Sequence, residues 1–237
     1  YERNNQWGDA EGVIGSLLAN YPDRSQIVSL YTEMLLRQGE IDKAGRMLDR
    51  LAENSPLRPR IEALQKAKQG RGEEAVAQLL KLIPNPLPPE QHQLVFNIAM
   101  LLEEIKEYET AEKLLRFYIS REPNRALVLA SYLGRRKGLE KLDEAFQMCE
   151  QAIPSFRIES ITQIGVASLR KHMIELEEAQ KKDEYVRRVQ QWLDNGIRQS
   201  PDSKALLLQI AEFEDLQGNM EKVIQVYQKY LSRTDID

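Results

Sequence analysis

A small residue followed by large apolar residues at helical spacing recurs along the whole chain of 237 residues. Ala111, for example, is followed by Leu115, Tyr118 and Ile119, and then by Pro123. The equivalent anchor positions are Ala10, Ala44, Ala75, Ala111, Ala145, Val189 and Val223. Three of the six intervals between anchors are 34 residues long, and the others are 31, 36 and 44. Such a period indicates a repeat architecture, in which each unit buries its apolar face only by stacking on its neighbours.

From the second unit on, an amphipathic segment precedes each anchor. The clearest examples cover residues 25–38, 91–107 and 203–217, where apolar residues return every three or four positions. This spacing places them on one face of an α-helix. Four glycines stand where such a first helix should end in a left-handed turn: Gly39, Gly70, Gly138 and Gly218. Each repeat is therefore predicted to be a helix, a short turn and a second helix that contains the anchor.

The composition agrees with a helical protein. Apolar residues make up 42% of the chain and charged residues 30%, with only 12 Gly and 10 Pro. No long alternating run of β-branched residues is present, so we expect an all-α fold with almost no strand. The formal net charge of −4 gives no concentrated positive field, so nucleic acid is not an expected partner. No apolar stretch approaches the roughly 18 residues that a membrane span requires, so we expect no membrane insertion.

The pattern resembles the tetratricopeptide repeat, a helix–turn–helix unit of about 34 residues. The unit that begins at His92 carries its motif in Val95, Ile98, Ala99, Leu102, Tyr108, Ala111, Leu115, Tyr118, Ile119 and Pro123. The resemblance covers the whole chain and implies a right-handed superhelical solenoid of antiparallel helix hairpins. We expect one solenoid domain with a half repeat at 1–24 and hairpins at about 25–56, 57–87, 90–124, 125–157, 158–201 and 202–237. Because the chain opens with Tyr1 rather than Met, we expect it to be part of a longer protein.

The longest interval between anchors predicts an elongated hairpin. Its first helix is expected to run from about residue 158 to residue 183, and the surplus lies at residues 175–184. Glu177 with Lys181, and Glu178 with Lys182, have the spacing of ion pairs on an exposed helix. The extension is either a contact arm or a solvated helix face, and the sequence leaves both open.

The residues needed for catalysis or metal binding are scarce. His92 and His172 lie in different hairpins, and Cys149 is the single cysteine. A zinc site needs several such ligands at close spacing. Cys149 falls at a core position of the repeat, which favours a buried and unreactive thiol. No phosphate-binding glycine loop or nucleophile motif is present. We therefore expect no enzyme activity, no cofactor and no metal.

In tetratricopeptide repeats the first helices line a concave binding face. Carried over to this chain, the resemblance implies that this face includes Gln26, Ser29, Leu30, Glu33, Arg37, Gln93, Phe96, Asn97, Met100, Leu127, Ser131, Thr162, Gln163, Val166, Leu208, Gln209 and Glu212. Amide side chains among scattered apolar ones suit an extended peptide or a partner helix.

One class of ligand is not expected on this face. Some family members hold acidic chaperone tails in a clamp of Lys, Asn and Arg. Here Ser29, Glu33, Leu127 and Ser131 stand where that clamp needs basic residues or asparagine. The resemblance therefore predicts no clamp for the carboxylates of chaperone tails.

The leading hypothesis is a protein-interaction scaffold that binds a peptide or a partner helix on the concave face. Two alternatives remain open. The chain could be a structural spacer or self-association segment of a larger multidomain protein, or a regulatory module of an attached enzyme. The sequence indicates no cellular compartment.

Overall fold

The computed structural model describes residues 7–22, 24–85, 88 and 92–232. Within these residues the chain forms thirteen α-helices and no strand, which confirms the predicted all-α class. In chain order they are α1 (Trp7–Asn20), α2 (Ser25–Gln38), α3 (Ile41–Leu48), α4 (Arg58–Lys68), α5 (Gly72–Lys81), α6 (His92–Glu104), α7 (Tyr108–Ile119), α8 (Ala126–Gly134), α9 (Leu139–Ala152), α10 (Ile158–Glu178), α11 (Lys182–Gln199), α12 (Lys204–Leu216) and α13 (Met220–Leu231). A short 3-10 helix, η3 (Pro123–Arg125), precedes α8.

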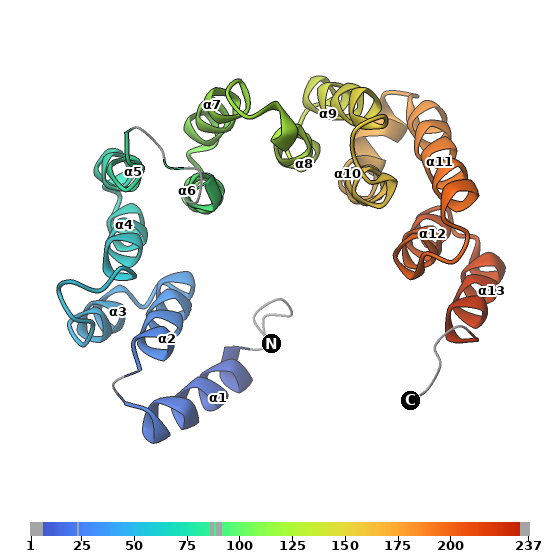
Figure 1. Cartoon of the computed structure of the whole chain (residues 1–237). Coiled ribbons are helices and arrows are strands. Elements are labelled where there is room, and N and C mark those ends of the chain that lie inside the picture. The colour runs from blue at the N-terminus through green and yellow to red at the C-terminus, as the bar shows by residue number, and fades with distance from the viewer. Residues whose placement is uncertain (1–6, 23, 86–87, 89–91, 233–237) are drawn as a thin grey trace. The chain divides into compact units, whose positions relative to one another are not determined.

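The helices pack into two compact units, residues 1–115 and residues 116–237, and α7 crosses the boundary between them. In unit 1, α2 packs against α3 and α4 against α5. In unit 2 the pairs are α8 with α9, α10 with α11, and α12 with α13. The first helices of consecutive pairs also contact each other, as α2 contacts α4, and α10 contacts both α8 and α12 (Figure 1). This is the predicted architecture of stacked helix hairpins.

The predicted glycine turns are confirmed at Gly39, Gly70 and Gly218, whose φ angles are 82°, 80° and 76°. The prediction for Gly138 is wrong, because α8 already ends at Gly134, and Gly138, with φ 104° and ψ 127°, instead precedes the start of α9. At Gly39, the N–H of the glycine donates to the Leu36 carbonyl (3.2 Å), and the next N–H donates to the Leu35 carbonyl (2.9 Å). These bonds close the end of α2, and only glycine adopts such an angle without steric cost. The chain can therefore reverse within a few residues and begin α3.

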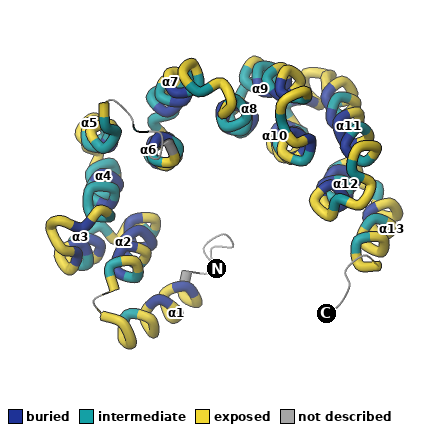
Figure 2. The backbone as a smooth tube through the Cα atoms, viewed as in Figure 1, coloured by how far each residue is buried: buried dark blue, intermediate teal, exposed yellow. Residues whose placement is uncertain are grey.

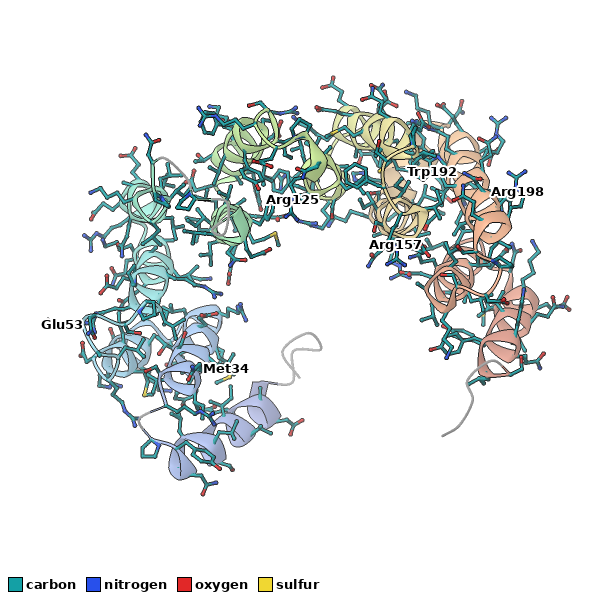
Figure 3. All side chains as sticks on the ribbon, viewed as in Figure 1. Met34, Glu53, Arg125, Arg157, Trp192 and Arg198 are labelled. Carbon is teal, nitrogen blue, oxygen red and sulfur yellow. The ribbon has the colours of Figure 1, made fainter. Side chains whose placement is uncertain are left out.

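The anchor positions form the core of each hairpin. The exposed fractions are 6% for Ala10, 1% for Ala44, 7% for Val223, and 0% for each of Ala75, Ala111, Ala145 and Val189. Figure 2 shows the buried residues on the sides where helices face each other. In unit 1, Met34 of α2 joins Ala10 and Ile14 of α1 in a small cluster (Figure 3). The repeat pattern thus marks the residues that hold the helices together.

The core of unit 2 contains an aromatic cluster. The ring of Phe146 from α9 lies 4.9 Å, centroid to centroid, from the rings of both Tyr185 and Trp192 on α11. Trp192, labelled in Figure 3, also lies against Gly165 of α10. A Cβ placed on Gly165 would stand 2.8 Å from the Trp192 Cζ3 and 3.0 Å from the Val189 Cγ2. The α10–α11 crossing therefore requires a residue without a side chain.

The elongated hairpin differs in detail from its prediction. α10 ends at Glu178, five residues before the expected end, and α11 already begins at Lys182. Gln180 has a φ of 57° and turns the chain between them. As a result Glu177 pairs with Lys182 rather than with Lys181. The surplus residues therefore lengthen both helices, to 21 and 18 residues, with the turn inside the 175–184 segment.

Replacing Gly165 with alanine should destabilise the protein. Overpacking a filled core costs about 1–3 kcal/mol, which exceeds the gain of about 0.5–1 kcal/mol from alanine's helix propensity. Gly15 of α1 is the matched control, because nothing lies within 4 Å of its added Cβ. Urea unfolding should show a loss of stability for Gly165→Ala and no loss for Gly15→Ala. Equal stabilisation by both changes would contradict the packing.

Candidate functional site

The sides of the first helices that are not covered by other helices form the candidate site. We call the side made by α2, α4 and α6 the first-helix face of unit 1, and the side made by α8, α10 and α12 that of unit 2. Eight residues of the predicted set are exposed: Gln26, Leu30, Arg37, Gln93, Asn97, Met100, Gln163 and Leu208. Phe96, Leu127, Ser131 and Glu212 are half-buried, whereas Ser29, Glu33, Thr162, Val166 and Gln209 are buried. The buried ones pack against neighbouring helices.

Two matching stripes run along α2 and α6. Residues 26, 30, 33 and 37 of α2 are spaced by four, three and four positions, as are residues 93, 97, 100 and 104 of α6. This spacing places each set on one side of its helix. The α2 stripe has one amide, Gln26, and the α6 stripe has two, Gln93 and Asn97. Each stripe also has one exposed apolar side chain, Leu30 at 45% and Met100 at 51%. On α6, the Gln93 amide donates to the Asn97 Oδ1 (3.2 Å).

A chain of four alternating charges links the three first helices of unit 1. Arg60 of α4 approaches the Glu33 Oε2 on α2 with its Nη2 (3.0 Å). The Arg37 Nη2 lies 3.9 Å from the same oxygen, and the Arg37 Nε donates to the Glu104 Oε1 on α6 (3.0 Å). Arg37 and Glu104 are therefore paired although they are 67 positions apart. The ionic chain bridges the ends of the two stripes.

Glu33 is the buried member of this ionic chain, with an exposed fraction of 7%. Burial raises the pKa of its carboxyl above the ordinary value, and this effect outweighs the attraction of Arg60 and Arg37. Ser29, also buried, donates its hydroxyl to the Glu33 Oε1 (3.4 Å). These partners satisfy a charge that would be costly to bury alone.

In unit 2 the predicted polar residues mostly bond to neighbouring repeats. The Thr162 hydroxyl of α10 donates to the Gln209 side-chain oxygen of α12. The Gln209 amide donates to the Glu159 carbonyl (3.0 Å), and Arg170 forms an ion pair with Glu212. These groups connect α10 to α12, and they have little hydrogen-bonding capacity left for a ligand. Gln163 is exposed on this face, and so is Leu208, at 42%.

Sequence reasoning missed Arg60, Glu104 and Glu159, because each acts across helices that are far apart in the sequence. The repeat alone could have pointed to Glu104, because Glu104 is the last residue of the α6 stripe just as Arg37 is the last residue of the α2 stripe two repeats earlier. His172 was also missed as a structural link. Its Nε2 lies 3.2 Å from the Gly134 carbonyl of α8, and its Nδ1 lies 2.9 Å from the Glu175 carboxylate. This buried ring joins α8 to α10.

Cys149 and Arg188 lie beside the aromatic cluster of unit 2. The Arg188 guanidinium carbon stands 4.9 Å from the Phe146 ring centroid, and its nitrogens bond Asp143 (3.2 Å) and Glu150 (2.8 Å) on α9. Arginine can stack and form ion pairs at once, so it fastens α11 to α9. Cys149 is fully buried, as its place in the repeat predicted. Cys149 therefore contributes to the packing of this core.

Comparison with known families supports this architecture. Residues 1–59 match a family model described as tetratricopeptide repeat. The matched residues hold α1, α2, α3 and the start of α4, and the later helices pack in hairpins of the same kind. The family supports a general role in protein–protein interaction. No curated protein matches the chain.

Among the described residues, no group of three or more His, Cys, Asp or Glu side chains is arranged to hold a metal ion. Over the same residues, no helix has both the length and the apolar character that crossing a membrane requires.

The free energy of unfolding should change with pH as Glu33 titrates. Its folded pKa is raised, so its contribution to stability is greatest at low pH and falls as the pH rises from 4.5 through the raised pKa. Glu33→Gln cannot titrate. The difference in unfolding free energy, variant minus wild type, should therefore increase over this window in urea unfolding experiments and level off above it.

Glu74 provides a control of opposite sign. A hydrogen bond from Arg71 lowers the pKa of this exposed carboxyl, so its contribution to stability is lost as the pH falls below 4.5. For Glu74→Gln the same difference should decrease as the pH rises towards 4.5, by a smaller amount because exposed pairs are weak. A Glu33→Gln difference that fell with rising pH would contradict the buried geometry.

The Cys149 thiol should be unreactive in the folded protein. Burial, with a smaller effect of Glu150, raises its pKa from 9.0 to about 12, so almost no thiolate exists near pH 8. A colorimetric thiol reagent should find no reactive group in the native state and one per chain in concentrated urea. Rapid reaction of the native protein would show that this core opens readily.

Proposed function

We propose that the first-helix face of unit 1 binds a protein partner as an extended peptide or an amphipathic helix. The observation that carries this proposal is the pair of matching stripes on α2 and α6. Each presents one large apolar side chain, Leu30 or Met100, beside exposed amides: Gln26 on α2, and Gln93 and Asn97 on α6. Leu30 and Met100 would give affinity through burial, and the amides would bond the backbone of the partner.

The ionic chain fixes the helices of this face relative to each other before a ligand binds. Arg60, Glu33, Arg37 and Glu104 connect the three first helices of unit 1 through ion pairs. A face whose helices are fixed beforehand loses less conformational entropy when a ligand arrives. The arginines are already paired with carboxylates, so the face does not select strongly for an acidic ligand. This supports a neutral peptide with apolar side chains.

The face of unit 2 is a weaker candidate. Its predicted polar residues Thr162, Gln209 and Glu212 bond to neighbouring helices. Of the predicted residues in unit 2, Gln163 and Leu208 are exposed, whereas Leu127, Ser131 and Glu212 are half-buried. We therefore place the main contact in unit 1. The scarcity of nucleophile, base and metal-ligand groupings supports a binding role without catalysis.

The proposal is tested by changing both apolar side chains of the stripes. Leu30→Asp combined with Met100→Asp should abolish partner binding, because a charge replaces each apolar contact. Both side chains are exposed, so far-UV circular dichroism and the urea midpoint should stay close to wild type. Binding is measured by site-specific photo-crosslinking from position 26, followed by mass spectrometry of the captured peptide.

Leu80→Asp is the matched control, since Leu80 is an exposed leucine on the second helix α5 of the same unit. This variant should keep the partner. If both variants capture the same peptide at the same yield, the first-helix face of unit 1 is not the binding site.

A further inference from the structure

Arg60 belongs to α4, the second of the three helices that make the first-helix face of unit 1, and most of its hydrogen-bonding capacity is unused. Its Nη2 donates to the Glu33 Oε2 (3.0 Å). A guanidinium carries five N–H groups. Within the described residues Arg60 forms no other hydrogen bond, and its Nε is buried without an acceptor. The side chain is 42% exposed, so its terminal nitrogens can still donate to a ligand.

Arg58, two positions earlier on α4, shows how this helix uses an arginine for structure. Its Nε donates to the Glu62 Oε1 (2.9 Å), and its Nη1 donates to the carbonyls of Leu48 (3.3 Å) and Leu51 (2.6 Å). Its side chain is 20% exposed. These bonds connect α4 to the end of α3. Arg60 has no such set of acceptors, and a buried donor without an acceptor lowers stability, so folding alone does not account for its placement.

Arg60 also lies close to the apolar side chain of the α2 stripe. Its partner Glu33 follows Leu30 by three residues on α2. The two positions are therefore on the same side of the helix and roughly 4.5 Å apart along its axis, at 1.5 Å per residue. A ligand that covers Leu30 thus passes within reach of the guanidinium.

The charges around Arg60 favour a neutral acceptor. The two arginines and two glutamates of the ionic chain cancel each other. A ligand carboxylate placed on Arg60 would lie close to the Glu33 carboxylate, and the two negative charges would repel each other. A carbonyl oxygen accepts the same N–H groups without this repulsion. The ligand atom that fits Arg60 is therefore a carbonyl oxygen.

The form of the partner decides whether such an oxygen is available. In an extended peptide each residue presents a backbone carbonyl that has no internal partner. An α-helix bonds its carbonyls internally except in its last turn. The exposed amides of Gln26, Gln93 and Asn97 likewise suit free backbone groups. A face that offers donors beside an apolar side chain therefore fits an extended peptide better than a helix.

We infer that the partner of this face is an extended peptide, one of whose backbone carbonyl oxygens accepts from the Arg60 guanidinium while a nearby apolar side chain covers Leu30. The inference rests on the binding face proposed above and decides between the two forms of partner left open there. Adjacent residues of an extended peptide are about 3.3 Å apart, so the carbonyl at Arg60 lies roughly one or two residues from the side chain at Leu30.

The test begins with two displayed libraries of peptides of about twelve residues, one linear and one held helical by a covalent staple. Both are selected on the full chain. The linear library should yield binding peptides, and the affinity of the most enriched one is then measured by fluorescence anisotropy. This peptide is the probe for the variants.

Arg60→Lys keeps a positive charge beside Glu33 but loses the planar donor group. It should weaken binding of the probe by about tenfold, as expected for the loss of a hydrogen bond to a charged group. Arg71→Lys is the matched control, because Arg71 pairs with Glu74 at the start of α5, a second helix of the same unit. That variant should bind the probe like wild type.

A double-mutant cycle separates a direct contact from a change in the fold. Each backbone amide of the probe is replaced in turn by an ester, whose carbonyl is a weaker acceptor. At one position the ester should weaken binding to the wild type several-fold and have little further effect on binding to Arg60→Lys. At the other positions the two losses should be additive.

The inference is overturned if the linear library yields no binding peptide, if Arg60→Lys binds the probe as tightly as wild type, or if the losses are additive at every position. The proposed function is tested separately with the same probe, through Leu30→Asp combined with Met100→Asp. Loss of binding in that variant together with an unchanged Arg60→Lys would uphold the face and reject the role of Arg60. Binding that survives the double change but falls in Arg60→Lys would uphold the contact at Arg60 and reject the two apolar contacts.

Discussion

Close approach of two helices at a residue with little or no side chain is the contact that the rest of the structure depends on. Ala75, Ala111 and Ala145 are fully buried at such positions, and Gly165 leaves room for the Trp192 ring. When helices cross this closely, the large apolar residues one turn away reach the next hairpin and fill the space between repeats. Without this close crossing each hairpin would bury too little apolar surface to be stable, because the residues that cover its apolar face belong to the neighbouring hairpins.

Apolar packing sets the stacking, and a few polar contacts across repeats connect the first helices. In unit 1 the ionic chain from Arg60 to Glu104 joins α4, α2 and α6. In unit 2 Thr162 and Gln209 join α10 to α12. Glu33, Arg37, Thr162 and Gln209 stand at positions where the sequence resemblance predicted ligand contacts. They bond to neighbouring helices instead, and this leaves Leu30 and Met100 as the prominent exposed apolar side chains of the face proposed for binding in unit 1.

Much of the fold could be predicted from the sequence because it depends on local patterns. The anchors Ala44 and Val189 mark buried crossings, and Gly39 and Gly218 mark the left-handed turns. The turn at Gln180 could not be predicted, because glutamine rarely adopts a positive φ and the surrounding charges suggested a continuous helix. In the candidate site, the exposure of Leu30 followed from the repeat. The pairing of Arg37 with Glu104 did not, since it depends on the distance between helices two repeats apart.

The burial of Trp192 gives the molecule a built-in optical reporter. The chain has two tryptophans, and the indole of Trp192 is 4% exposed between Phe146 and Gly165. An indole shielded from water emits at shorter wavelengths than a hydrated one, so this residue reports when the α10–α11 crossing opens. Backbone circular dichroism reports on all the helices at once. Comparing the two signals during unfolding would reveal whether the two units lose their structure together or in sequence.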